Sequence, residues 1–156
     1  LRQGLRVNAV STDLNELVST AAAQLNGAAD VEVIRELAPL PRIVVDPEQV
    51  SKVIVNLLLN AREAIVSHGQ IRIVTTPVEG FAVVTVADTG CGMTAEFINR
   101  RLFRPFQTTK SKGLGIGMYQ SRMIVEAQGG RIEAESQPGR GSTFRVFLPL
   151  PAVRAA

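Results

Sequence analysis

The sequence predicts an α+β fold, a two-layer sandwich in which a mixed sheet is covered on one face by about three helices. Three segments have the apolar spacing or the capping residues of helices, and five or more short segments have the composition of strands. The strands of the second half are largely joined by hairpin turns. With 156 residues, 46% hydrophobic and 20% charged, the chain suits one folded domain and is not disordered by composition.

The N-terminal half is expected to contain two helices. Its earlier elements are a strand at 5–10, a helix from 13 to about 25, and strands at 31–37 and 42–45. The second helix has a clear start, because Asp46 can cap it, Pro47 suits the first helical position and Gln49 can complete a capping box. It should run to about Val66. Its predicted buried stripe is Val50, Val53, Ile54, Leu57, Ala61, Ala64 and Ile65.

The C-terminal half is expected to be richer in strands. The predicted elements are strands at 70–76 and 81–87 around a turn at 77–80, a short helix at 94–103, a loop at 104–117, a helix at 118–128, strands at 131–136 and 143–148, and a tail at 149–156. Gly129 and Gly130 should stop the last helix. A single domain with its core at about 5–149 is therefore predicted.

Composition excludes several classes of protein. Cys91 is the one cysteine, so no internal disulfide can form, which fits a reducing compartment such as the cytoplasm. No apolar run approaches the ~20 residues of a membrane span. Only 4% of residues are aromatic and Trp is absent, which argues against a base-stacking nucleic-acid surface. The chain starts with Leu, and we therefore expect a fragment of a longer protein.

Basic residues gather in one segment, although the net charge is only +3. Between Phe97 and Val125 there are no acidic residues and six basic ones: Arg100, Arg101, Arg104, Lys110, Lys112 and Arg122. Such a patch suits a phosphate-bearing ligand. A solvated basic face is the alternative interpretation.

Two asparagines interrupt the apolar run of the second helix. Asn56 and Asn60 are four residues apart and so share one helix face. Asparagine is a poor residue for a helix interior, and burying its amide without partners costs about 1–3 kcal/mol. Amide oxygens can ligate Mg²⁺ together with substrate phosphates. Amides that are satisfied by the backbone are the alternative.

Two glycine motifs follow at the ends of predicted elements. Asp88 comes after a strand and leads into Gly90 and Gly92, so its carboxylate could accept from an exocyclic amine beside a backbone that approaches a flat ligand. Further on, a G-x-G-x-G run (residues 113–117) precedes a helix, where backbone N–H groups favour phosphate. It matches neither a Walker A loop nor a dinucleotide fingerprint. Each motif alone is also compatible with an ordinary loop.

The order of these motifs carries more information than any one of them. Asn-x₃-Asn, D-x-G-x-G, F-R-P-F (residues 103–106), G-x-G-x-G and G-R-G-S-T-F (residues 139–144) together resemble the GHKL superfamily. More closely, residues 5–149 resemble the catalytic ATP-binding domain of a bacterial sensor histidine kinase. That resemblance implies a Bergerat-type ATP-binding fold, ATP and Mg²⁺ as cofactors, and transfer of the γ-phosphoryl group to a protein histidine.

The resemblance also implies roles for individual residues. Asn60 would coordinate Mg²⁺ and Asn56 would face the phosphates, while Asp88 would read adenine in a pocket shaped by Gly90, Gly92 and Met93. Phe103 and Phe106 would hinge a lid over the nucleotide. The remaining nucleotide-side residues would be Glu63, Thr108, Thr109, Lys110, Gly113, Leu114, Gly115, Gly117 and Met118, with Gly139, Gly141 and Thr143 in the last box. Thr143 would hold adenine through water.

Two departures from the family pattern bear on mechanism. Many histidine kinases carry Lys and then an aromatic residue where this sequence has Glu63 and Ala64, so more phosphate charge is assigned to Lys110, with Arg104 as a helper. The segments Asn-Ala-Arg-Glu-Ala and Phe-Gln-Thr-Thr-Lys resemble kinases of the nitrogen-regulation and oxygen-sensing type. Hydrolytic relatives place a Glu where Asn56 stands, so phosphoryl transfer is favoured over hydrolysis.

The resemblance implies partners outside this chain. His68 lacks the surroundings of a phosphoacceptor and is expected to be a solvent-facing turn residue. The acceptor would lie on a dimerising helical domain upstream, with a response regulator downstream, and any membrane anchor would be upstream as well. Two alternatives are an anti-sigma-factor serine kinase, against which Asn56 and the F-R-P-F motif argue, and a non-catalytic ATP-responsive module. Nucleic-acid binding explains the basic segment less economically than nucleotide phosphates do.

Overall fold

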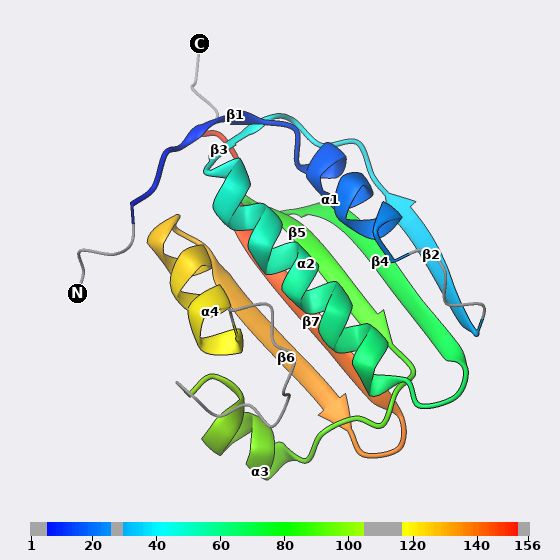
Figure 1. Cartoon of the computed structure of the whole chain (residues 1–156). Helices are drawn as coiled ribbons and strands as arrows, with labels where there is room; N and C mark the ends of the chain where they lie inside the picture. Colours follow the sequence, from blue (N-terminus) through cyan, green and yellow to red (C-terminus); the bar gives the residue numbers. More distant parts are fainter. Residues whose placement is uncertain (1–5, 26–29, 105–116, 153–156) are drawn as a thin grey trace.

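A five-stranded sheet with helices on one face forms the body of the chain (Figure 1). The structure is a computed structural model that describes residues 6–25, 30–104 and 117–152. The elements in chain order are β1 (Val10–Thr12), α1 (Leu14–Ala23), β2 (Val31–Leu37), β3 (Ile43–Val45), α2 (Pro47–Ala64), β4 (Gly69–Val78), β5 (Phe81–Asp88), α3 (Ala95–Phe97), the π-helical turn η1 (Ile98–Leu102), α4 (Met118–Ala127), β6 (Arg131–Gln137) and β7 (Gly141–Pro149). The predicted α+β sandwich is confirmed.

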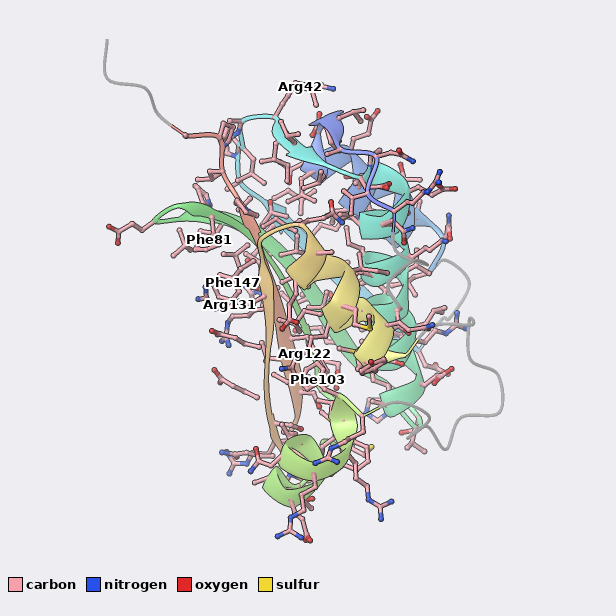
Figure 2. The ribbon with its side chains drawn as sticks, turned by 90° about the vertical axis from the view of Figure 1, so that its left-hand side faces the viewer. Arg42, Phe81, Phe103, Arg122, Arg131 and Phe147 are labelled. Atoms are coloured by element: carbon pink, nitrogen blue, oxygen red, sulfur yellow. The ribbon has the colours of Figure 1, made fainter. Side chains whose placement is uncertain are left out.

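The sheet is mixed, with strand order β2-β4-β5-β7-β6. β2 and β4 are parallel, and the other three pairs are antiparallel. β7 pairs with β5 on one side and with β6 on the other, so the last strand of the chain lies inside the sheet. The long α2 lies over the sheet, along the direction of its central strands and between α1 and α4, and all three helices cover the same face (Figures 1 and 2).

The core fills the space between this helical layer and the sheet. The predicted stripe of α2 is buried at Val50, Val53, Ile54, Leu57 and Ala61, whereas Ala64 and Ile65 near the helix end are only partly buried. These side chains pack in one cluster with residues of α1, α4 and the inner face of the sheet. Because apolar burial stabilises by about 25 cal/mol per Å², this interface fixes the position of α2.

The opposite face of the sheet is covered by its own side chains. Arg131 lies over the rings of Phe147 and Phe81, at 3.8 and 5.2 Å from their centroids, and the two rings meet edge to face (Figure 2). Ion pairs Arg145–Glu135 and Arg72–Glu36 join neighbouring strands on this face. Phe147 is therefore only 7% exposed although none of the described helices covers it.

Several element boundaries differ from the sequence prediction, and the last strand, expected at 143–148, spans Gly141–Pro149. A strand was expected at 5–10, whereas the observed strand β1 spans Val10–Thr12. Its position is set by pairing with β3, which joins Val10 to Val45 and Thr12 to Ile43, and the second pair is buried. β4 continues through Pro77, which lies beyond the end of β2 at an unpaired edge that accepts proline. The helix expected at 94–103 is one short α-helical segment followed by η1.

Candidate nucleotide-binding site

The helix that carries the two predicted asparagines is anchored at its start by Asp46. Asp46 is 4% exposed, and its Oδ1 accepts from the Gln49 N–H at 3.2 Å, as a capping residue does. Its Oδ2 accepts from the Asn8 N–H at 2.9 Å, and its own N–H donates to Gln128 Oε1 at 2.6 Å. Asp46 thus joins the N-terminal segment, α2 and the end of α4 at one point.

Both asparagines of α2 turn their amide nitrogens towards α4. Asn56 is 5% exposed, and its Nδ2 donates to Ser121 Oγ at 3.1 Å and to Met118 Sδ at 3.5 Å. Asn60 is partly buried, and its Nδ2 lies 3.6 Å from the same sulfur. Side chains of α4 therefore supply acceptors for the amide nitrogens of both residues, and for Asn56 these take the place of the backbone partners of the alternative interpretation.

Asp88 ends β5 at the same end of the sheet as the C-terminus of α2. Its side chain is 7% exposed, and Oδ1 accepts from the Gly90 N–H at 2.8 Å. The Cys91 N–H donates to the carbonyl of Ala64, the last residue of α2, at 2.9 Å. The loop after Asp88 is thus bound to the helix turn that follows Asn60, which places the predicted adenine side beside the predicted metal side.

The glycines of this loop are required by packing against protein. A Cβ at Gly90 would lie 2.4 Å from the carbonyl oxygen of Ala64, and a Cβ at Gly92 would lie 2.0 Å from that of Gln137. Gly92 also has φ +73°. The sequence prediction explained both glycines by the approach of a flat ligand, whereas here they let the loop fit between α2 and the β6–β7 hairpin.

Ser142, which the sequence analysis did not select, lies directly beside Asp88. The two residues are register partners in β5 and β7, and Ser142 is 6% exposed. Thr143 pairs with Ala87, and because strand side chains alternate, it lies on the other face of the sheet. The structure thus separates Thr143 from Asp88. Alternation along β7 is the signal that could have identified Ser142.

Ser142 also belongs to a small hydroxyl network that supports Met93. Its Oγ is 2.8 Å from Ser136 Oγ, which accepts from the Met93 N–H at 2.6 Å. Met93 is partly buried and packs against the core, so the network fixes the backbone at the predicted adenine-packing residue.

Comparison with known proteins identifies the family. Residues 45–152 match the model of the family HATPase_c, described as histidine kinase-, DNA gyrase B-, and HSP90-like ATPases. The chain belongs to this family. The resemblance drawn from the motifs is thereby confirmed.

Relatives of this HATPase_c chain include sensor histidine kinases. It is 40% identical to the sensor histidine kinase ZraS of Klebsiella oxytoca over 146 residues, which are 90% of this chain and 31% of ZraS. The catalytic domain of histidine kinase ThkA has a TM-score of 0.81 and 27% identity, covering 92% of this chain and 96% of that domain. ThkA in complex with the response regulator TrrA gives a TM-score of 0.78 and 25% identity, covering 93% of this chain and 42% of the matched chain. The chain thus spans about a third of the ZraS sequence.

Part of the predicted site of this HATPase_c domain lies outside the described residues. That part comprises Phe106, Thr108, Thr109, Lys110, Gly113, Leu114 and Gly115. Gly117 precedes α4, and its carbonyl accepts from the Ser121 N–H. Glu63 is exposed on α2, one turn beyond Asn60. Immediately after η1, Phe103 packs under Arg122, whose Cζ is 5.4 Å from the ring centroid (Figure 2). The next residue, Arg104, is exposed.

His68 is not one of the residues assigned to this site. It is exposed in the turn between α2 and β4, as predicted, and borders an open hollow of about 620 Å³. The hollow is also lined by Asp30, Glu32, Gly69, Gln70 and Thr89, and none of the predicted site residues lines it. In the described part of the HATPase_c domain, no helix has the length and apolar composition needed to cross a bilayer.

Proposed function

We propose that this domain binds ATP with Mg²⁺ and donates the γ-phosphoryl group to a histidine on a dimerising helical domain outside the chain, for relay to a response regulator. The observation that carries the proposal is the bonding of the Asp88 loop to the last turn of α2. This bond supports the assignment of a buried carboxylate and the two asparagines to one site. Membership of an ATPase family supports ATP as the ligand.

Asp88 is assigned to the adenine. A buried carboxylate at a strand end can accept from an exocyclic amine, and a hydrogen bond to a charged group contributes about 1.5–3 kcal/mol. Oδ1 is already oriented by the Gly90 N–H, so the carboxylate is fixed before a ligand arrives. Ser142 adds a hydroxyl on the same face, which we assign to the adenine side in place of Thr143.

The asparagines are assigned to the phosphates and the metal. Within the described segments, no three or more His, Cys, Asp or Glu side chains are grouped to hold a metal ion. Amide oxygens of Asn56 and Asn60 are nevertheless hard ligands, and Mg²⁺ is commonly held by few protein groups together with substrate phosphates. The residues present therefore fit Mg²⁺, with Asn60 as the proposed ligand. When bound, Mg²⁺ would neutralise charge on the phosphates.

The chemistry proposed for this chain is positioning. Asn56 is neutral and buried at the position where hydrolytic relatives carry a general base for water. Transfer of the γ-phosphoryl group to a protein histidine is therefore favoured over attack by water. The exposed basic residues Arg100, Arg101 and Arg104 immediately precede the predicted lid. We assign Lys110, with Arg104 as a helper, to balancing the negative charge of the phosphates. The acceptor histidine and the response regulator are partners of the whole protein. We place this domain in the cytoplasm.

The test uses the full-length protein incubated with ATP labelled at the γ-phosphate. We expect an acid-labile, base-stable phosphohistidine that maps outside residues 1–156 and persists in His68→Ala. Label on a serine of a separate regulator would instead support the serine-kinase alternative. Nucleotide binding without any label would support the non-catalytic module, and release of inorganic phosphate without protein label would indicate a hydrolase.

A further inference from the structure

The sulfur of Met118 lies between the amide groups of the two asparagines. Its distances to Asn56 Nδ2 and Asn60 Nδ2 are 3.5 and 3.6 Å. Met118 is 6% exposed and is the first residue of α4. One thioether thus contacts both side chains that are assigned to the phosphate and metal side of the site.

The thioether discriminates between the two orientations of each amide. A thioether sulfur accepts hydrogen bonds and cannot donate one, whereas an amide group has a donating nitrogen and an accepting oxygen. With Nδ2 turned towards the sulfur, each amide is stabilised, and a reversed amide would place two acceptors against each other. Ser121 is 0% exposed, and its Oγ accepts the other Nδ2 hydrogen of Asn56. A hydroxyl can both donate and accept, so Ser121 could pair with either orientation of the Asn56 amide.

The consequence concerns the amide oxygens. Nitrogen and oxygen project in different directions from the same amide carbon, so turning Nδ2 of Asn60, the proposed metal ligand, towards α4 leaves its Oδ1 directed elsewhere. A hard divalent cation takes the oxygen and not the nitrogen of an amide. The contact with Met118 therefore selects the orientation that metal binding needs before the metal is present.

The position of α4, the helix that carries the sulfur, is itself fixed by packing. α4 is attached to the start of α2 through the Gln128–Asp46 hydrogen bond, and Met118 meets α2 near its other end. Ser121, Ile124 and Val125 bury the intervening face of α4. The helix is therefore held against α2 at both ends, and this fixes the backbone from which the Met118 side chain extends.

We propose that Met118 is a positioning residue for the metal side of the site, acting through Asn56 and Asn60, with Ser121 supporting Asn56. The inference rests on the proposed function, because it concerns how the domain binds a nucleotide with Mg²⁺. It assigns Met118 no contact with the phosphates. Groups that support metal ligands in this way typically change metal affinity by about 10–100-fold when they are replaced.

The test compares Met118→Leu, which keeps volume but removes the acceptor, with Met123→Leu, an exposed methionine of the same helix. ADP affinity is measured by calorimetry with and without Mg²⁺. We expect the ratio of ADP affinity with Mg²⁺ to ADP affinity without Mg²⁺ to fall about 10-fold in Met118→Leu. Ser121→Ala should lower the enhancement less, and Met123→Leu should retain it.

A second readout uses the ligand-free protein. In ¹⁵N–¹H spectra, Met118→Leu should shift the side-chain amide signals of both Asn56 and Asn60, Ser121→Ala those of Asn56, and Met123→Leu neither. A full Mg²⁺ enhancement in Met118→Leu would overturn the inference and leave the proposed function standing. Failure of the unchanged chain to bind ADP would overturn both.

Discussion

Asp88 and Ser142 are register partners on neighbouring strands, and both side chains are buried on the helix-covered face of the sheet. This pairing joins the end of β5 to the start of the last strand. The last strand therefore contributes directly to the proposed adenine side, in addition to completing the sheet.

Replacing Asp88 by Ala should weaken ADP binding. Loss of a hydrogen bond to a charged acceptor costs about 1.5–3 kcal/mol, which corresponds to about 10–150-fold in affinity. Calorimetric titration measures the change, with Asp30→Asn, an exposed acid in the hollow beside His68, as the control. Unchanged affinity would mean that adenine is read elsewhere.

The serine and threonine of β7 should behave differently. Ser142→Ala should lower ADP affinity about 2- to 10-fold, the range for one neutral hydrogen bond, because its hydroxyl lies beside Asp88. Thr143→Val should leave affinity within about 2-fold, because its side chain lies on the opposite face of the sheet. The reverse order of effects would restore Thr143 to the site.

Asn60→Ala should act mainly through the metal. We expect nucleotide affinity in the absence of Mg²⁺ to be retained and the enhancement by Mg²⁺ to be lost, since one oxygen ligand is removed. The exposed Asn99→Ala is a matched control. If Mg²⁺ still strengthens ADP binding equally in Asn60→Ala, Asn60 is not the ligand.

Two capping aspartates should differ in their contribution to stability. Asp13 caps α1 through one exposed bond to the Glu16 N–H at 3.2 Å, whereas buried Asp46 makes the cap of α2 and also binds the Asn8 N–H. Asp13→Ala should lower the free energy of unfolding by about 1 kcal/mol and Asp46→Ala by about 2–4 kcal/mol. Urea denaturation distinguishes them, and equal losses would contradict the junction at Asp46.

Two glycines with similar backbone angles should differ in their tolerance of alanine. Gly80 has φ +81° and nothing within 4 Å of an added Cβ, so Gly80→Ala should cost only the strain of about 1–2 kcal/mol. Gly92 has φ +73° and a backbone oxygen 2.0 Å from that Cβ. Overpacking should add about 1–3 kcal/mol in Gly92→Ala. Equal unfolding free energies would show that the loop relaxes freely.

Much of the fold could be predicted because its signals are local. Asp46 and Pro47 mark the start of α2, and apolar spacing along the helix predicts its buried face. The strand expected at 5–10 was wrong because a short strand is defined by its partner: β1 begins where Val10 meets Val45. Nothing within residues 5–10 specifies that register.

The site was predictable where a residue type itself was unusual. Asparagines inside an apolar helix (Asn56 and Asn60) and the strand-end Asp88 were selected for that reason, and the structure brings their elements together. Ser142 was missed because the choice between adjacent hydroxyls depends on which face of β7 each occupies. The contact of Met118 with both asparagines depends on how α4 packs against α2, which spacing along the chain does not encode.

The order of strands has a consequence for synthesis of the protein. Chains grow from the N-terminus, and domains generally fold as units once their sequence is available. Because β7 separates β6 from β5, neither β6 nor the edge of β5 has its neighbour until residues 141–149 have been made. A nascent chain that stops before Gly141 would expose the unpaired edge of β5, a surface prone to aggregation, and would lack Ser142, which we assign to the adenine side of the site.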